Sequence, residues 1–412
     1  MREYFPVWEL KVKRLIIVLV LPILVIGGLS ACKPSSESWQ IGKHWQIGEH
    51  WQYSPQAIWG DIFIGTEYIF SGGLEAQYIS TYNLHTREKQ RVTEFPVNYL
   101  VDEPSIYNDR VVWASCYYSQ EMRESPQKDI VSLNWDVFLL DLKTGELQQI
   151  TTEEHAQTEP RIYGDTIVWL DTRHEAENRY PHYYDVYAYD LNTNQERRLT
   201  STNSIMENDL GISGDLVVWT DSRYAELSQD GYYRQHDNNE IYVYNLTTGQ
   251  EKRITTYPGN DCHPVIDDGR IVWLREWEAR EADIFLHDMK DSREIKISES
   301  GFVAYNSYPS IYKNLIVWAD ARISQGNTAG DIIEGGKSGA AEIYLYNLDT
   351  KQETQLVPSL TEGEYTLEVG GQDMRFTQRQ VWMRPMVCGD YVVYEKEIMI
   401  GPTIHAIKLS KE

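Results

Sequence analysis

One ten-residue phrase returns along the chain and constrains the fold more than any other feature of the sequence. Its fullest form is Pro, any residue, Ile, any residue, Gly-Asp, any residue, Ile or Val, and Val-Trp, as in Pro160–Trp169. A second phrase follows each copy and opens mostly with an acid, as in DVYAYDL at 185–191. A third phrase, such as TGQEKRIT at 248–255, comes next. Repetition at a fixed period indicates an architecture built from one unit many times over.

Each repeat predicts four short β-strands, which we name A to D in chain order. Gly-Asp and Thr-Gly pairs suit tight turns between antiparallel strands because these residues tolerate positive φ. β-branched and aromatic residues in period-2 alternation are typical of strands. The units are spaced about 45–56 residues apart. The sequence therefore predicts an all-β fold, a β-propeller of four-stranded blades.

The number of copies bears on how the ring closes. The A, B and C phrases occur seven times and the D phrase six times. Residues 38–52 precede the first A strand, and we expect them to supply the missing D strand. Seven blades are therefore favoured, and six is the alternative if the weak first or last copy is not a blade. Residues 355–384 are expected to be an insertion, folded as a hairpin on one face.

The N-terminal residues predict export. A basic head is followed by an apolar run from 15 to 28 and then by Leu29-Ser30-Ala31-Cys32. This order is typical of a secretory signal, and the Cys after Leu-Ser-Ala resembles the lipobox of bacterial lipoproteins. That resemblance implies that Cys32 carries a lipid such as palmitate and begins the mature chain. The alternative is a transmembrane anchor, for which the apolar run is short. The expected organisation is a lipoprotein signal peptide at 1–31, a tether with the closing strand at 32–54, and the propeller at 55–412.

The charge of the chain restricts its partners. The formal net charge is −24 at pH 7. A field of that sign repels phosphate backbones, which argues against nucleic acid and leaves the lipid anchor as the only expected membrane contact. Besides Cys32, the chain has Cys116, Cys262 and Cys388. Because three is odd, at least one of them stays free or pairs between chains.

The phrases GD-x-IVW-x-D-x-R, DIYxYDL and RLT resemble the TolB-like propeller repeat, which occurs in many bacterial and archaeal cell-surface proteins. The resemblance covers about residues 55–412 and implies the fold. TolB has a small α/β domain ahead of its propeller, whereas about 20 residues separate Cys32 from the first blade here. Peptidases with similar propellers add an α/β-hydrolase domain, and no G-x-S-x-G sequence is present.

An Asp-x-Arg sequence follows strand B in several blades. A ligand-binding rim of charges is one interpretation. The other is a local ion pair or turn that fixes the B–C loop, and recurrence favours it, because a residue present in each copy serves what the copies share. The copies are Asp171/Arg173, Asp221/Arg223 and Asp320/Arg322.

The residue just before strand A differs between blades and is therefore free to specialise. Strand A lines a propeller's axis, and the B–C and D–A loops share one face, called here the loop face. We expect this residue at the channel mouth on that face. Carboxylates and an imidazole in one arc suit a divalent cation such as Ca²⁺; the alternative is plain drift at a wet mouth. The position holds Glu103, Glu159, Asp209, His263, Tyr308 and Arg384, and the first four are the predicted metal ligands.

The B–C loops are long and rich in aromatic residues. Loops on a rigid scaffold often carry binding, and tyrosine gives a large contact area at low entropic cost. Packing between adjacent loops is the alternative. Together with Arg384, the predicted rim is Tyr117, Tyr118, Tyr183, Tyr184, Tyr232, Tyr233 and Trp277.

Two functions follow from these patterns. The first is a lipid-anchored binding or scaffold protein of the cell envelope, without enzymatic activity, that holds a protein or glycan. The second is a metal-assisted polysaccharide lyase or another carbohydrate-active enzyme. The acidic chain favours the first, because a lyase for polyanions requires a basic cleft. His263 and Arg384 are the residues that support the second.

Overall fold

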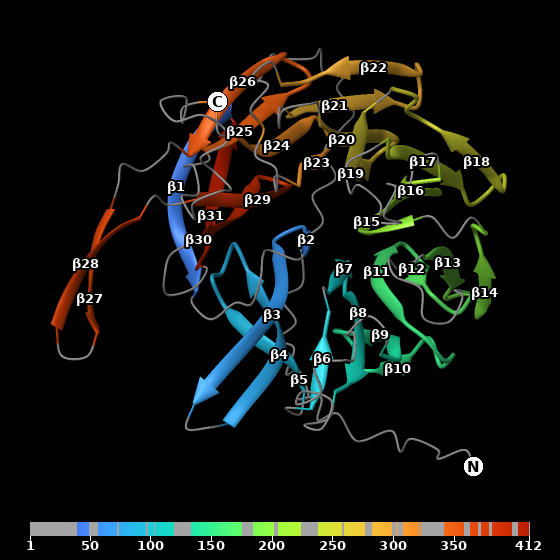
Figure 1. The fold of residues 1–412 in the computed structure, drawn as a ribbon, viewed down its shortest axis with the longest axis horizontal. Helices are drawn as coiled ribbons and strands as arrows, with labels where there is room; N and C mark the ends of the chain where they lie inside the picture. Colours follow the sequence, from blue (N-terminus) through green and yellow to red (C-terminus); the bar gives the residue numbers. More distant parts are fainter. Residues whose placement is uncertain are drawn as a thin grey trace, which may run out of the picture.

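The computed structural model describes residues 39–48, 57–71, 74–95, 98–102, 104–118, 133–174, 184–201, 205–223, 238–257, 259–276, 282–298, 303, 308–320, 322, 342–357, 363–369, 372–378, 381–397 and 403–411. Among these residues, seven antiparallel sheets stand in chain order around one axis (Figure 1). The predicted all-β propeller of seven blades is therefore confirmed. No helix of the described part is long and apolar enough to span a membrane.

The first four blades follow the predicted A-B-C-D order. Blade 1 contains β2 (Ala57–Trp59), β3 (Ile62–Ser71), β4 (Leu74–Asn83) and β5 (Lys89–Phe95). Blade 2 has a divided strand A, β6 (Tyr99–Val101) and β7 (Ser105–Tyr107), followed by β8 (Arg110–Tyr117), β9 (Trp135–Asp141) and β10 (Leu147–Gln149). Blade 3 contains β11 (Gln157–Tyr163), β12 (Thr166–Asp171), β13 (Asp185–Asp190) and β14 (Gln195–Arg198). Blade 4 contains β15 (Ile205–Ser213), β16 (Leu216–Asp221), β17 (Glu240–Asn245) and β18 (Gln250–Arg253).

The remaining blades complete the ring. Blade 5 contains β19 (Asn260–Asp267), β20 (Arg270–Glu276), β21 (Ala282–Asp288) and β22 (Arg293–Lys296). Blade 6 contains β23 (Ser310–Tyr312), β24 (Leu315–Asp320), β25 (Glu342–Asn347) and β26 (Gln352–Val357). Blade 7 contains β29 (Val381–Cys388), β30 (Tyr391–Glu397), β31 (Thr403–Lys411) and β1 (Trp39–Gly48).

Strand β1 closes the ring as predicted. It pairs antiparallel with β31, so that Trp39 lies opposite Lys411 and Trp45 opposite Ala406. The predicted insertion at 355–384 is shorter than expected, because β26 extends to Val357 and β29 begins at Val381. Between these strands, β27 (Gly363–Val369) and β28 (Gln372–Gln378) form a separate two-stranded hairpin, which projects beyond the ring in Figure 1.

The strand-B tryptophans form the core between blades. Trp113, Trp169, Trp219, Trp273 and Trp318 are fully buried. Each stacks on an aromatic residue of strand C in its own blade, with centroid distances of 5.8 to 6.1 Å. Each also packs against the preceding blade, as Trp219 does against Val168. Hydrophobic burial therefore links every neighbouring pair from blade 1 to blade 6.

The Asp-x-Arg sequence forms a local network. The carboxylate of Asp171 accepts a hydrogen bond from the Trp169 indole N–H at 3.0 Å. It also forms an ion pair with Arg173 at 2.6 Å. Arg173 also pairs with Glu196 on strand D and lies over the Tyr187 ring. Blades 4 and 6 repeat these contacts. The repeated charges thus tie strands B, C and D together, in agreement with the local ion-pair interpretation.

A second network explains the acid that opens strand C and the Thr or Ser that ends the third phrase. In blade 3, Thr200 Oγ1 accepts a hydrogen bond from the backbone N–H of Val186 at 2.9 Å and donates to Asp185. Blades 2, 4 and 5 use Thr151, Thr255 and Ser298 in the same way. The hydroxyl takes the place of a backbone acceptor where the strand C–D ladder ends.

Candidate functional site at the loop-face mouth of the channel

The strands that line the axis are distorted where the variable residue precedes proline. In β11, β19 and β29 the pairing register shifts at this position, as in a β-bulge. The bulge residues have positive φ, +51° for Glu159, +55° for His263 and +44° for Arg384. Each of these strands also begins several residues before the proline, earlier than predicted. Positive φ is uncommon outside glycine and clusters at functional sites, which makes these three positions candidates for a functional site.

Three consecutive blades bring variable residues together. The His263 ring lies 4.2 Å from the Tyr308 ring, centroid to centroid. The Arg384 guanidinium carbon lies 4.6 Å from the centroid of the same tyrosine. All three side chains are partly exposed. The tyrosine thus holds an imidazole and a guanidinium at one mouth, an arrangement suited to aromatic and anionic groups.

The predicted metal ligands are only partly placed. Glu159 is 4% exposed, and His263 lies two blades further along. Glu103 lies outside the described residues, and for Asp209 the structure describes the backbone within β15 alone. Among the described side chains, no three or more His, Cys, Asp or Glu residues cluster closely enough to hold a metal ion. The cation site therefore stays a prediction.

The aromatic rim divides into exposed and buried members. Tyr117 is 45% exposed at the loop-face end of β8, and Tyr118 is partly exposed beside it. Tyr184 is 1% exposed and packs in the core between blades 3 and 4, so its ring does not face a ligand. Arg384 lies against Tyr308, the variable residue of the preceding blade, and its place in a binding rim stays a prediction. Tyr183, Tyr232, Tyr233 and Trp277 lie outside the described residues, as does Cys32.

Sequence reasoning missed Tyr257, which follows strand D of blade 4 on the same face. It is 40% exposed, and the Arg275 guanidinium lies 4.8 Å from its ring centroid. The sequence analysis looked for aromatic residues in the B–C loops alone. Tyr257 lies in a D–A loop, and both kinds of loop lie on the loop face.

The opposite mouth lies on the face of the A–B and C–D turns, called here the turn face, and it carries a second aromatic group, which the sequence analysis did not predict. The last residue of strand A varies as much as the first. Trp59 and Tyr107 lie 4.2 Å apart between centroids, and Tyr107 and Tyr163 lie 4.6 Å apart. Burial is the main cause that raises the pKa of Asp267 at this mouth, and burial likewise raises the pKa of Tyr163. Both groups are therefore held in their neutral forms more firmly than in water.

No family model and no curated protein matches the chain. Solved structures do resemble it. Acylaminoacyl peptidase from Pyrococcus horikoshii is 12% identical with a TM-score of 0.54, over 88% of this chain and 52% of the peptidase. TolB from Acinetobacter baumannii is 12% identical with a TM-score of 0.39, over 84% of this chain and 80% of TolB. An oligogalacturonate lyase in complex with manganese is 13% identical with a TM-score of 0.43, over 85% and 74% of the two chains.

These similarities concern architecture. This chain spans about half the length of the peptidase, and at such identities a shared fold does not carry a shared activity. The comparison and the strand topology agree on one conclusion: the chain folds as a β-propeller, similar to the propeller of the acylaminoacyl peptidase.

Proposed function

We propose that this protein is a non-catalytic binding module of the cell envelope, exported and held at the membrane by a lipid on Cys32. Its loop face would bind a protein ligand. The observation that carries the proposal is the contact of His263 and Arg384 with Tyr308, where three blades contribute different residues at an equivalent position.

The distribution of repeated and variable residues supports this assignment. The repeated Trp, Asp, Arg and Thr side chains are engaged in the core and in the strand networks. Of the variable residues, His263, Tyr308 and Arg384 are partly exposed. Tyr117 and Tyr257, two of the three exposed large hydrophobic residues of the described part, also lie on this face. Tyrosine and arginine are enriched among the residues that dominate protein interfaces, which favours a protein over a glycan.

The direction of β1 agrees with an upstream anchor. Strand β31 runs from the loop face to the turn face because it is strand C of blade 7, and β1 runs antiparallel to it. The chain therefore enters β1 at the turn face. An anchor ahead of Trp39 would leave the loop face directed away from the membrane.

Site-specific photo-crosslinking in the native envelope tests the proposal. A benzophenone amino acid at Tyr117 or Tyr257 should give a protease-sensitive crosslinked species. The same group at Lys143 or Lys290, on C–D turns of the opposite face, is the matched control and should give none. Replacing His263 and Arg384 together by Gln should lower the loop-face yield about tenfold, which corresponds to ~1.4 kcal/mol. Equal yields from both faces, or yields unchanged by the double replacement, would refute the proposal.

The same two mouth residues support lyase activity as the second candidate. Histidine is the commonest general base, and arginine binds carboxylates in a bidentate manner. Incubation with polygalacturonate and manganese, followed by ultraviolet absorbance of the unsaturated product, distinguishes the two functions. Binding alone predicts no product. Product that disappears in His263→Ala would replace the binding proposal with the enzymatic one.

A further inference from the structure

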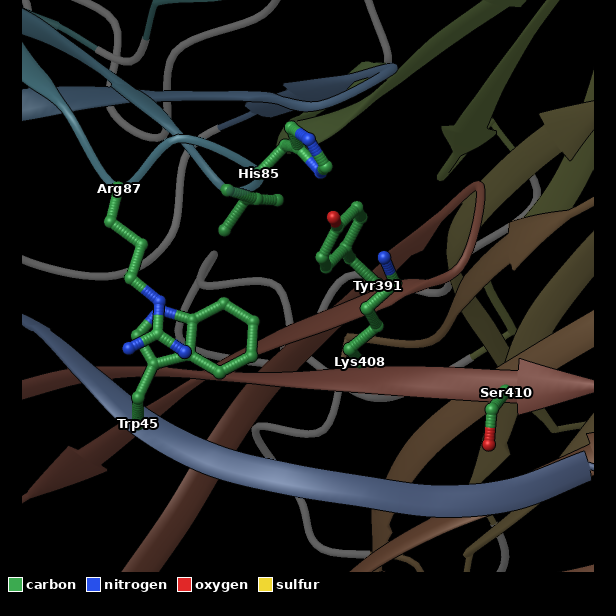
Figure 2. A pocket seen from close by; sticks show the side chains of 7 residues that line it. Trp45, His85, Arg87, Tyr391, Lys408 and Ser410 are labelled. Atoms are coloured by element: carbon green, nitrogen blue, oxygen red, sulfur yellow. The ribbon is translucent and has the colours of Figure 1, made fainter.

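A pocket of about 380 Å³ lies at the seam where the ring closes (Figure 2). Blade 7 contributes Trp45 from β1, Tyr391 from β30 and Lys408 from β31. Blade 1 contributes His85 and Arg87 from the turn between β4 and β5. The N-terminal strand, the C-terminal strand and the first blade therefore share one cavity.

The blade 1 wall is firmly held. The Asn83 side chain accepts hydrogen bonds from the backbone N–H groups of His85 at 2.9 Å and Thr86 at 2.8 Å. Arg87 adopts φ of +65°, and its N–H donates to the Asn83 carbonyl at 2.7 Å. These bonds fix the backbone of a tight turn from which the exposed side chains of His85 and Arg87 project, and a fixed backbone lowers the cost of binding.

The pocket is basic and aromatic in an otherwise acidic chain. The Arg87 guanidinium lies over the Trp45 ring, 4.8 Å from its centroid, and Lys408 Nζ lies 5.4 Å from the Tyr391 centroid (Figure 2). The Trp45 and Tyr391 rings meet edge to face at 6.2 Å. Of the ion pairs formed between described residues, none includes Arg87 or Lys408. Within the described part of the chain, both cations are therefore open to an anion from solution while they lie over their aromatic rings.

We propose that this seam pocket binds a small organic anion, a carboxylate carried on a six-membered ring. The carboxylate would be held by Arg87 and Lys408, since charge-assisted hydrogen bonds are the strong ones. The ring would pack against Trp45 and Tyr391. Pockets of this volume suit small ligands rather than polymers. A uronic acid and an aromatic acid share this chemistry.

Binding at this place has a consequence for the fold. A ligand that contacts β1, β31 and blade 1 is bound only by the closed ring, so it stabilises closure by mass action. The pocket lies on the turn face and is independent of the loop-face function, so either proposal can fail alone.

Calorimetry with the full protein tests the chemistry. Glucuronate and benzoate are the two probes, with glucose and benzyl alcohol as neutral matches and inorganic phosphate as an anion without a ring. At least one acid should bind with Kd below about 1 mM, while its neutral match and phosphate bind at least tenfold more weakly. The double replacement Arg87→Gln, Lys408→Gln should weaken the acid at least tenfold. Lys351→Gln, at the equivalent turn position of blade 6, is the matched control.

Hydrogen exchange supplies the second readout. The bound acid should slow amide exchange in β1 and leave the hairpin of β27 and β28 unchanged. Absence of binding for both acids, equal binding of neutral ligands or phosphate, or affinity unaltered in the double variant would each overturn the proposal.

Discussion

At the residue scale, blade 2 differs from its neighbours at one partly buried acid, Asp136. In blades 3 to 5 the acid that opens strand C pairs with a base on strand D, as Asp185 does with Arg198 at 2.6 Å. Blade 2 has Gln149 at that place. Burial raises the pKa of Asp136 to about 6, against the opposing effect of hydrogen bonds from Thr151 and Gln149. The missing cation makes this carboxyl a titrating group within the folded protein.

The first prediction concerns the pH dependence of stability. The unfolded pKa of Asp is about 3.9, below the folded value of about 6. The folded state then binds the proton more tightly, so this contribution to stability is fully present below about pH 4 and is lost as pH rises to about 6. Its size is about 2 kcal/mol, discounted for partial exposure. Urea unfolding across this range should show a smaller fall for Asp136→Asn than for wild type. Parallel curves for the two proteins would contradict the assignment.

The second prediction restores the missing partner. Gln149→Arg should place a guanidinium beside Asp136 and lower the pKa of that carboxyl. Because the carboxylate is then paired, the variant should gain up to about 1 kcal/mol of unfolding free energy at neutral pH. The gain should vanish in the Asp136→Asn background. A gain that persists there would mean that the arginine acts elsewhere.

The third prediction concerns Cys32, which lies outside the described residues. If this residue carries the lipid, Cys32→Ala should release the protein from the membrane fraction or block removal of the signal peptide. Ser35→Ala is the neighbouring control and should fractionate as wild type does. Membrane association and gel migration measure the outcome. An alanine variant that behaves as wild type in both assays would exclude the lipid anchor.

At the scale of the strand, the sequence predicted most of the architecture because each phrase carries local information. Alternation and turn residues located strands B and C closely, as DVYAYDL at 185–191 shows against β13. The start of strand A was predicted too late in the sequence, because the proline lies next to a bulge inside the strand and does not begin it. The packing of His263 and Arg384 on Tyr308 was not predictable either, since it depends on contacts across blades. Sequence variation located the mouth; only the fold shows which variable residues meet.

The fourth prediction tests closure. Deleting β1 removes the outer strand of blade 7 together with Ile47, and it uncovers Phe63 of blade 1, which packs in the same hydrophobic cluster. It also leaves β31 as an open edge, which invites association. The melting temperature should fall sharply, with aggregation in light scattering. Deleting 363–378, the separate hairpin, is the control and should change the melting temperature little. Similar effects of the two deletions would contradict closure by β1.

At the scale of the whole molecule, the reactivity of three buried cysteines can be used to follow the opening of the ring. Cys116, Cys262 and Cys388 are buried thiols that form no disulfide, and they lie in blades 2, 5 and 7. Burial raises the pKa of Cys116 to about 12 and that of Cys388 to about 11. The thiolate is the reactive form, so these thiols should be inert while the blades stay closed.

The fifth prediction is that the ring opens as one unit. Under increasing urea, the three thiols should become reactive over the same concentration range, because each blade packs on the next and no blade is stable alone. Mass spectrometry of alkylated peptides measures each site separately. Early labelling of Cys388 alone would show instead that blade 7 opens before the others.

The antiparallel seam of β1 and β31 also gives the molecule a mechanical direction. Trp39 lies opposite Lys411, and the strand ends near the loop face with Gly48 opposite Ile404. Ladder hydrogen bonds run perpendicular to the strands. Tension between an anchor ahead of Trp39 and a ligand on the loop face would pull β1 along its own length and load the ladder in shear, all bonds together. Tension between Trp39 and Lys411 would separate the same ladder one bond at a time. The seam therefore resists the pull of a tethered ligand far better than it resists being peeled from its ends.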